Sequence, residues 1–200
     1  WGTDADIHGA RYFELAPEDV LDQHPQFWGN LLERADIKLG QLQGNSYQQF
    51  IATEVLPDVA RLTGVRLERN RIAICGSSMG GLASLYGASK YPETYGTVLS
   101  LSTHWAFWAE GFMEKLLKLI PTHSRPRIWI DRGDLELDAN YIGLHERATE
   151  YLINHGWAIG TMLQTQVFSG TGHNEGAWAD RIAEVVNWWL TGIDYEADSA

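Results

Sequence analysis

Four short apolar runs alternate with segments of helical periodicity over most of the chain, and this alternation restricts the fold more than any other feature. The runs lie at residues 71–75, 97–101, 127–130 and 164–168. Each is too short for a helix and is followed by a segment whose apolar residues recur every three or four positions. Strands that alternate with helices form a parallel sheet, because each helix returns the chain to the starting edge of the sheet. The sequence therefore predicts an α/β fold.

The expected helices cover residues 47–63, 79–90, 112–120, 141–154 and 175–190. Most of them stop at a proline or a glycine, the residues that usually follow helix ends. Pro57 is different because it lies inside the first helical segment. A proline has no backbone N–H to donate, so we expect the helix to be kinked or divided there.

Residues 1–45 do not share this alternation. Glycines and prolines are scattered through them and their apolar residues occur only in short pairs. We expect an irregular segment of the kind that is functional or packed onto the domain, either a lid or a truncated connection. The catalytic core of the fold is expected at residues 46–195.

Composition and charge exclude several classes of protein. The 15 Lys and Arg against 26 Asp and Glu give a net charge of −11, which would repel nucleic acid. No apolar run approaches the roughly 18 to 20 residues that span a bilayer, so we expect no membrane partner. One cysteine, Cys75, excludes a disulfide framework and a cysteine-built zinc site. A single thiol is compatible with the cytoplasm, although the sequence leaves the compartment undetermined.

The most informative motif is Gly76-Ser77-Ser78-Met79-Gly80, a G-x-S-x-G pattern between an expected strand and an expected helix. In this setting the serine sits on a strained turn that exposes its hydroxyl, and small neighbours avoid a clash. Ser78 is therefore the candidate nucleophile, and the Met79 amide is the candidate donor to an oxyanion. The rival interpretation is a glycine-rich helix start that only packs closely on the sheet. A phosphate-binding loop is disfavoured because Gly-Lys-Ser/Thr is absent.

A serine needs a base to become a good nucleophile, and His173 is the best candidate. It lies in the glycine-containing loop 169–175, after the last strand and before the last helix. His104, after the second strand, is the second choice and is expected to line the substrate pocket with Trp105. The remaining histidines lack such a setting and are expected to be solvated: His8, His24, His123, His145 and His155.

The acid that orients the histidine should follow the third strand. The loop there offers four carboxylates, Asp131, Asp134, Glu136 and Asp138, and spacing alone does not choose among them. The same loop is a poor calcium site because the glycine that such loops require is missing. We therefore expect neither a metal nor a cofactor.

Several stretches together resemble the esterase branch of the α/β-hydrolase superfamily, which contains esterase D-like, feruloyl esterase-like and enterochelin esterase-like enzymes. They are residues 50–57, 74–81, 101–105, 131–134 with 137–141, and 172–178. The resemblance implies that Ser78 is the nucleophile and His173 the base. It favours Asp138 as the acid, because D-x-G-T followed by L-D-A is common in similar enzymes, and leaves Glu136 as the alternative. Asp134 stands where the family usually has threonine.

The resemblance also implies about four strands upstream of residue 46, and nothing in residues 1–45 reads as strands. The loop after the third of them supplies the second oxyanion amide in similar enzymes. The strand at 71–75 should then pair with a strand that this chain lacks, which would leave an exposed edge. We expect a missing N-terminal portion or an oligomeric partner to complete the sheet.

These observations predict a serine hydrolase that cleaves a small-molecule carboxylic ester through an acyl-enzyme. An aromatic patch lies between residues 103 and 119 and consists of His104, Trp105, Phe107, Trp108 and Phe112. We interpret it as the roof of a pocket for flat aromatic or sugar-bearing groups, with ordinary core packing as an equal alternative. Two other functions stay open. The chain could be a non-catalytic binding or assembly subunit, or an acyltransferase that uses the same three residues.

Overall fold

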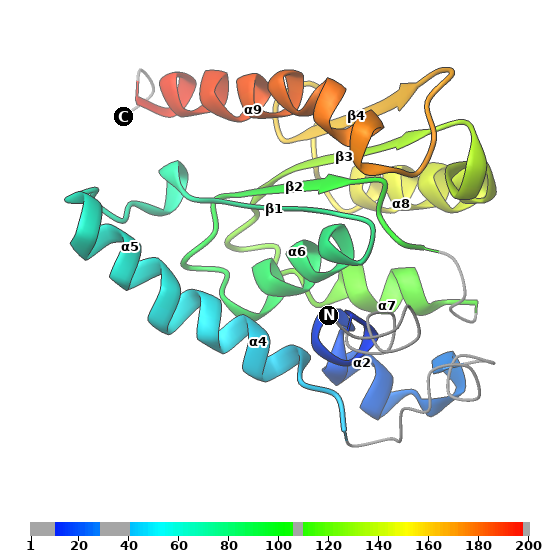
Figure 1. Ribbon diagram of the computed structural model, residues 1–200, viewed down its shortest axis with the longest axis horizontal. Helices are drawn as coiled ribbons and strands as arrows, with labels where there is room; N and C mark the ends of the chain where they lie inside the picture. The colour runs from blue at the N-terminus through cyan, green and yellow to red at the C-terminus, as the bar shows by residue number, and fades with distance from the viewer. Residues whose placement is uncertain (1–10, 29–40, 106–109, 198–200) are drawn as a thin grey trace.

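The computed structural model describes residues 11–28, 41–105 and 110–197. A four-stranded parallel sheet forms its centre, with strands in the order β1-β2-β3-β4 (Figure 1). The predicted α/β class is confirmed. The strands are β1 (Ala73–Ser77), β2 (Thr97–Leu101), β3 (Arg127–Gly133) and β4 (Leu163–Phe168). The first begins two residues later than expected, because a 3₁₀ turn occupies Arg69–Arg71.

Three helices connect successive strands and cover one face of the sheet. They are α6 (Met79–Lys90), α7 (Phe112–Lys118) and α8 (Ile142–Asn154), whereas α9 (Glu175–Ala197) lies on the opposite face (Figure 1). This division follows from right-handed crossovers, since strands added in one direction place all their connecting helices on one side.

Alternate residues of the strands build two separate cores, because successive side chains of a strand point to opposite faces. Val98, Ile128 and Ile130 are buried with α6, α7 and α8. Leu99, Leu101 and Trp129 are buried on the other face, where Val185 of α9 covers them. Each face of the sheet is thereby packed against its own layer of helices.

The helical segment with Pro57, for which the sequence predicted a kink or a division, stays helical throughout and changes to a π-helical turn just before the proline. It consists of α4 (Gly44–Phe50), the π-helical η2 (Ile51–Val55) and α5 (Leu56–Thr63), which follow one another along one path (Figure 1). Pro57 is the second residue of α5 and has no N–H to donate to the preceding turn, which is where the hydrogen-bond pattern of the helix changes.

The described part of the N-terminal segment is helical, which corrects the expectation of an irregular chain. Residues 11–15, α2 (Glu18–Gln23) and η1 (Pro25–Trp28) form short helices whose Leu21 and Phe27 are buried in the larger core. Pro17 and Pro25 mark the starts of helices here instead of interrupting them. A role of residues 1–45 as a lid or a connection remains a prediction, and residues 1–10 and 29–40 lie outside the described part.

The outer edge of β1 carries no paired strand within the described residues. All five residues of β2 are buried, whereas β1 is only partly buried and Cys75 is exposed. A groove of about 310 Å³ separates β1 from α4 and η2, with Tyr47, Ile51 and Cys75 in its lining. Within the described residues β1 therefore has no outer neighbour, and completion of the sheet by an N-terminal portion or a partner stays a prediction.

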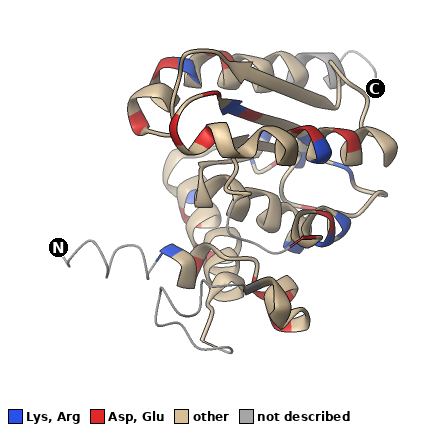
Figure 2. Ribbon diagram, turned by 90° about the vertical axis from the view of Figure 1, so that its right-hand side faces the viewer, with Lys and Arg blue, Asp and Glu red and all other residues tan. Residues whose placement is uncertain are grey.

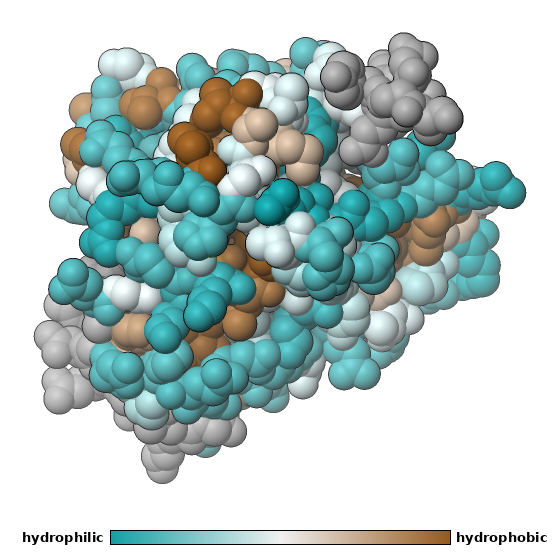
Figure 3. Space-filling view, turned by 180° about the vertical axis from the view of Figure 1, so that it is seen from behind, coloured by the Kyte–Doolittle hydropathy of each residue, from teal (hydrophilic) through white to brown (hydrophobic). Residues whose placement is uncertain are grey.

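The surface is mixed in character. Apolar patches lie between hydrophilic residues on the rear face (Figure 3). Leu62 and Val65 are the most exposed of the large apolar residues, at 73% and 63%. Within the described ranges, no helix combines the length and the apolar character needed to cross a membrane.

Candidate active site

The turn from β1 to α6 places Ser78 in a conformation that non-glycine residues rarely adopt. Its φ is 56° and its ψ is −123°. Backbone hydrogen bonds hold the turn on both sides: Ser78 donates its N–H to Leu101 O at 2.9 Å, and His104 donates its N–H to Ser78 O at 3.2 Å. Leu101 is the last residue of β2 and His104 lies just after it. Hydrogen bonds to this neighbouring segment therefore hold Ser78 in a backbone conformation that costs about 1–3 kcal/mol. The strained turn that the motif predicted is present.

The glycines around Ser78 have different reasons to be there. A Cβ on Gly76 would lie 2.4 Å from the backbone carbonyl atoms of Gly80, and one on Gly81 would lie 2.6 Å from Ser100 Oγ. A Cβ on Gly80 would meet nothing within 4 Å. The expectation that the neighbours of Ser78 must lack a side chain is therefore confirmed for Gly76 and wrong for Gly80. Gly76 must lack a Cβ because it packs closely against the backbone of Gly80.

Ser78, His173 and Asp138 form a continuous line of hydrogen bonds. Ser78 Oγ lies 2.8 Å from His173 Nε2, and His173 Nδ1 lies 2.6 Å from Asp138 Oδ1. Ser78 is at the carboxyl end of β1, His173 in the loop after β4, and Asp138 in η4 (Glu136–Tyr141) after β3. The parallel sheet brings the three together because the carboxyl ends of all its strands share one edge.

Asp138 is fully buried and accepts hydrogen bonds on both oxygens. Oδ2 receives the Ser102 hydroxyl and the Gly133 N–H, each at 2.6 Å. Burial acts to raise the pKa of Asp138, but the hydrogen bonds from His173, Ser102 and Gly133 outweigh it and hold the pKa below the ordinary value. The carboxylate is thus ionised where it faces the imidazole.

The other three carboxylates of the acidic loop have different partners. Asp131 accepts from Arg181 Nη2 at 2.8 Å, while Asp134 accepts from Ser169 Oγ at 2.8 Å and from the Gly170 N–H at 2.7 Å. Acidic residues surround the carboxyl ends of the strands in Figure 2. The sequence alone could not choose the acid among these four carboxylates. In the structure, each of the other three contacts a partner other than the His173 ring, which Asp138 contacts.

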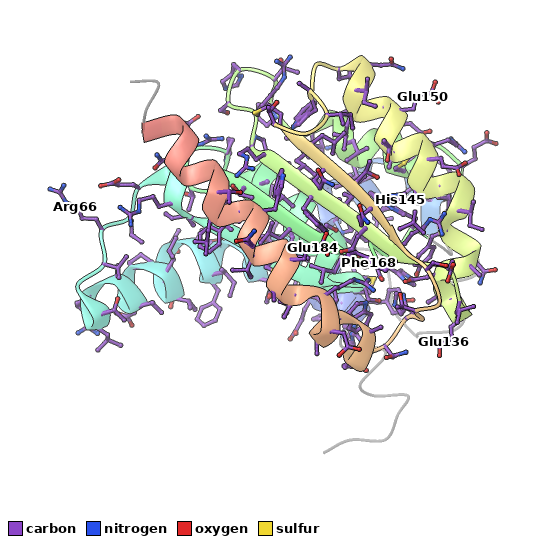
Figure 4. The ribbon with its side chains drawn as sticks, turned by 90° about the horizontal axis from the view of Figure 1, so that it is seen from above. Arg66, Glu136, His145, Glu150, Phe168 and Glu184 are labelled. Atoms are coloured by element: carbon purple, nitrogen blue, oxygen red, sulfur yellow. The ribbon has the colours of Figure 1, made fainter. Side chains whose placement is uncertain are left out.

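Glu136 contacts the backbone of His173 instead of its ring. Its Oε2 accepts the His173 N–H at 2.8 Å and the Asn174 side-chain amide at 3.3 Å. Figure 4 shows Glu136 at the outer end of the acidic loop. A Cβ on Gly172 would lie 2.4 Å from this carboxylate, so the glycine allows the two loops to meet. Asp134 and Glu136 together hold the loop that carries His173.

His104 is buried and held by two tyrosines. Its Nδ1 lies 2.8 Å from the Tyr141 hydroxyl and its Nε2 lies 3.1 Å from the Tyr12 hydroxyl. Burial, with nearby His173 and Arg11, lowers the pKa of His104 to about 3, so the ring is neutral at pH 7. The ring nitrogens are directed at the tyrosines, and the backbone of His104, not its ring, contacts Ser78.

The predicted aromatic roof lies partly within the core. Trp105 and Phe112 are 3% and 1% exposed and belong to the larger apolar cluster, in which Phe112 packs edge-on against Phe27. Phe107 and Trp108 lie outside the described residues. A role of His104 and Trp105 in lining a substrate pocket stays a prediction.

His145 is buried, contrary to the expectation that it is solvated. It shares a face of α8 with Ala148 and Leu152, at the helical spacing that could have revealed its burial. Its Nε2 lies 2.8 Å from Thr165 Oγ1, and burial lowers its pKa to about 4. Of the other histidines, His123 and His155 are exposed and His24 is half-buried, whereas His8 lies outside the described part.

Met79 begins α6, so its N–H is among the first amides of the helix, which have no intrahelical acceptor. The part of the chain that is described holds no strand before β1, and hence no counterpart of the upstream loop expected to supply a second oxyanion amide. In the same residues, no group of three or more His, Cys, Asp and Glu is arranged to hold a metal ion.

Sequence reasoning missed three residues behind Asp138: Ser102, Trp178 and Arg181. Trp178 Nε1 and Arg181 Nη2 both donate to Ser102 Oγ, at 3.0 Å and 2.7 Å. No local pattern could have joined a serine after β2 to an arginine 79 positions later, because the contact exists only when α9 lies across the sheet.

A strained serine turn between a strand and a helix of a parallel sheet, with a histidine in the loop after the last strand, defines an α/β-hydrolase-like fold. Residues 33–188 match the model of a family described as "Putative esterase". The chain belongs to this family, as the resemblance in the sequence indicated.

Known relatives agree with this assignment. The Iron(III) enterobactin esterase of Dickeya dadantii (strain 3937) is 27% identical in an alignment 166 residues long, which covers 74% of this chain and 36% of the relative. The solved enterobactin esterase from Shigella flexneri has a TM-score of 0.57 at 21% identity, over 74% of this chain and 39% of that one. An S-formylglutathione hydrolase from Staphylococcus aureus has a TM-score of 0.55 at 20% identity, over 74% and 61%. This chain thus spans little more than a third of the enterobactin esterases it matches.

Proposed function

We propose that this protein is a carboxylic ester hydrolase that uses Ser78 as nucleophile, His173 as base and Asp138 as acid. The observation that supports it best is the line of hydrogen bonds from Ser78 Oγ through the imidazole to Asp138, with lengths of 2.8 Å and 2.6 Å. A nucleophile, a base in contact with it and a third group that orients the base are the elements of acyl transfer by a serine. Membership of an esterase family supports the same reaction.

In the proposed mechanism, Ser78 Oγ attacks the ester carbonyl while His173 Nε2 takes the hydroxyl proton. Asp138 stabilises the imidazolium, and the Met79 amide donates to the negative oxygen of the tetrahedral intermediate. The imidazolium then gives its proton to the departing alcohol, which leaves Ser78 acylated. Water, deprotonated by His173, attacks the acyl-enzyme and releases the carboxylic acid and the free serine.

The proposal is tested with a fluorophosphonate probe, which forms a phosphorus–oxygen bond to an activated serine and releases fluoride. We expect one equivalent of probe on Ser78, no labelling of Ser78→Ala and strongly reduced labelling of His173→Ala. Hydrolysis of aryl esters and of enterobactin is measured in parallel, because the Dickeya and Shigella relatives are named for enterobactin. Folded wild-type protein that takes up no probe would overturn the proposal and favour a non-catalytic binding subunit. Acyl transfer to an alcohol or thiol in place of water would indicate an acyltransferase.

We also propose that further strands, from an N-terminal portion or from a partner, complete the sheet beyond β1 in the functional protein. The partial burial of β1, its exposed Cys75 and the groove beside it support this proposal. An unpaired apolar edge invites association, so natural sheets usually cover one. The covering part is also where the second oxyanion amide would come from.

A further inference from the structure

Ser102 lies at the centre of a buried polar cluster behind the candidate acid. It is 0% exposed, follows β2 directly and has a φ of 43°. Its hydroxyl has three polar neighbours among the described residues: Trp178 Nε1 at 3.0 Å, Arg181 Nη2 at 2.7 Å and Asp138 Oδ2 at 2.6 Å. The first two come from one face of α9, three positions apart.

The chemistry of these neighbours determines the direction of each hydrogen bond. An indole N–H and a guanidinium can only donate, so both lone pairs of Ser102 Oγ are occupied. The single hydroxyl proton then has one acceptor left, which is Asp138 Oδ2. Ser102 therefore donates to Asp138, and the two donors of α9 polarise that hydrogen bond.

Arg181 is anchored on the same side. It is 4% exposed and pairs with Asp131, which is 1% exposed and also accepts the Ser102 N–H at 3.0 Å and Trp129 Nε1 at 2.8 Å. The Arg181 guanidinium carbon lies 4.9 Å from the centre of the Phe168 ring, which Figure 4 shows beside α9. The backbone and the side chain of Ser102 are thus fixed by one ion pair.

The charges of this cluster bear on the imidazole. Burial raises the pKa of Asp131, and the Arg181 guanidinium in contact with it opposes that rise. As an ion pair the two balance each other's charge, so Asp138 supplies the unbalanced negative charge that faces the imidazole. Other titratable groups near His173 in the described residues include Glu136 on its backbone amide, Tyr141 with ring centres 5.7 Å apart, and His104 behind Tyr141. Arg181 is the one described cation that contacts the cluster.

We propose that Ser102 is a positioning residue that couples the Arg181 guanidinium of α9 to Asp138 and so sets the protonation of His173. This inference rests on the proposed function for its catalytic meaning. Ser102 touches neither Ser78 nor the imidazole in any described contact, so it acts through Asp138. It keeps Oδ1 directed at His173 by holding Oδ2.

The test replaces Ser102 with alanine and uses Ser100→Ala as the matched control. Ser100 is also fully buried in β2, but its hydroxyl contacts Thr103 instead of Asp138. Loss of the Ser102 donor makes Asp138 more basic. We therefore expect the NMR titration midpoint of the His173 imidazole to move up by about 0.5–1 pH unit. We expect kcat to fall about tenfold with KM within about twofold, and the control to match wild type.

Two substitutions of Arg181 extend the test. Arg181→Met removes the cation and leaves Asp131 buried without a partner, so it can fail to fold, and Arg181→Lys keeps the test informative in that case. Arg181→Lys retains the charge, so its His173 titration should stay close to wild type, whereas a folded Arg181→Met should titrate at higher pH. An unchanged midpoint in Ser102→Ala, with Ser78 still labelled by the probe, would overturn the coupling alone. If the His173 midpoint shifts in Ser102→Ala but the wild-type protein takes up no probe, the proposed function is overturned and the coupling stands.

Discussion

Glu136 and Asp138 stand two positions apart in η4, yet their carboxylates contact different parts of His173. Glu136 Oε2 accepts the backbone N–H at 2.8 Å, whereas Asp138 Oδ1 faces ring Nδ1 at 2.6 Å. The positive φ of Glu136, 53°, turns the chain between β3 and η4 so that both side chains reach the same histidine. One residue therefore places the loop and the other orients the ring.

This division predicts unequal effects of two conservative substitutions. Asp138→Asn should lower kcat by about 10⁴-fold, because an amide neither stabilises the imidazolium nor favours the correct tautomer. Glu136→Gln should lower it by less than about tenfold, because the amide oxygen can still accept the backbone N–H. Steady-state ester hydrolysis measures both. A larger loss in Glu136→Gln than in Asp138→Asn would mean that Glu136 is the acid.

The two glycines of the serine turn should respond differently to alanine. In Gly76→Ala the new Cβ would lie 2.4 Å from the backbone of Gly80, so the turn must shift. We expect a loss of stability of about 2 kcal/mol or more, with loss of Ser78 labelling. Gly80→Ala places its Cβ in open space on α6, and higher helix propensity should stabilise it by up to about 1 kcal/mol. Urea unfolding of both variants checks this, and equal destabilisation would contradict it.

Stability should decline as the pH falls from about 6.5 towards 4. His145 has a pKa lowered from 6.5 to about 4 by burial, so between these values the unfolded chain binds a proton that the folded chain excludes. Its contribution is complete above 6.5 and is lost on acidification, by about 3 kcal/mol at most. The free energy of unfolding of His145→Gln should therefore depend less on pH between 7 and 5 than that of wild type. Exposed His155→Gln is the control, and an unchanged slope in His145→Gln would refute the assignment.

Completion of the sheet beyond β1 predicts the reactivity of Cys75. The thiol is exposed beside the unpaired edge in the described residues, and the chain has no other cysteine. If additional strands cover the edge in the working protein, native Cys75 should react with a maleimide far more slowly than the same thiol in denaturant. Mass spectrometry follows the reaction. Equally fast labelling of the native protein would show that the edge is open.

Local patterns were sufficient for the four strands, for the main helices after residue 43 and for part of the candidate site. The alternation of apolar runs and helical segments predicted all four strands within a few residues, because strand and helix periodicity are properties of short stretches. The serine turn was also predictable, since Gly76, Ser78 and their flanking strand and helix are contiguous. The helices of residues 11–28 were missed because their apolar residues are few and become buried only against distant elements.

Only the tertiary structure decided which carboxylate faces His173 and what stands behind it. Asp131, Asp134, Glu136 and Asp138 are alike in sequence, and their partners Arg181, Ser169 and His173 are brought to them by β4 and α9. The sequence by itself determined the α/β class and the strained position of Ser78, because both depend on neighbours along the chain. Contacts between residues tens of positions apart depend on how the strands are ordered and on which face of the sheet each helix covers, and these are settled only when the whole core is buried.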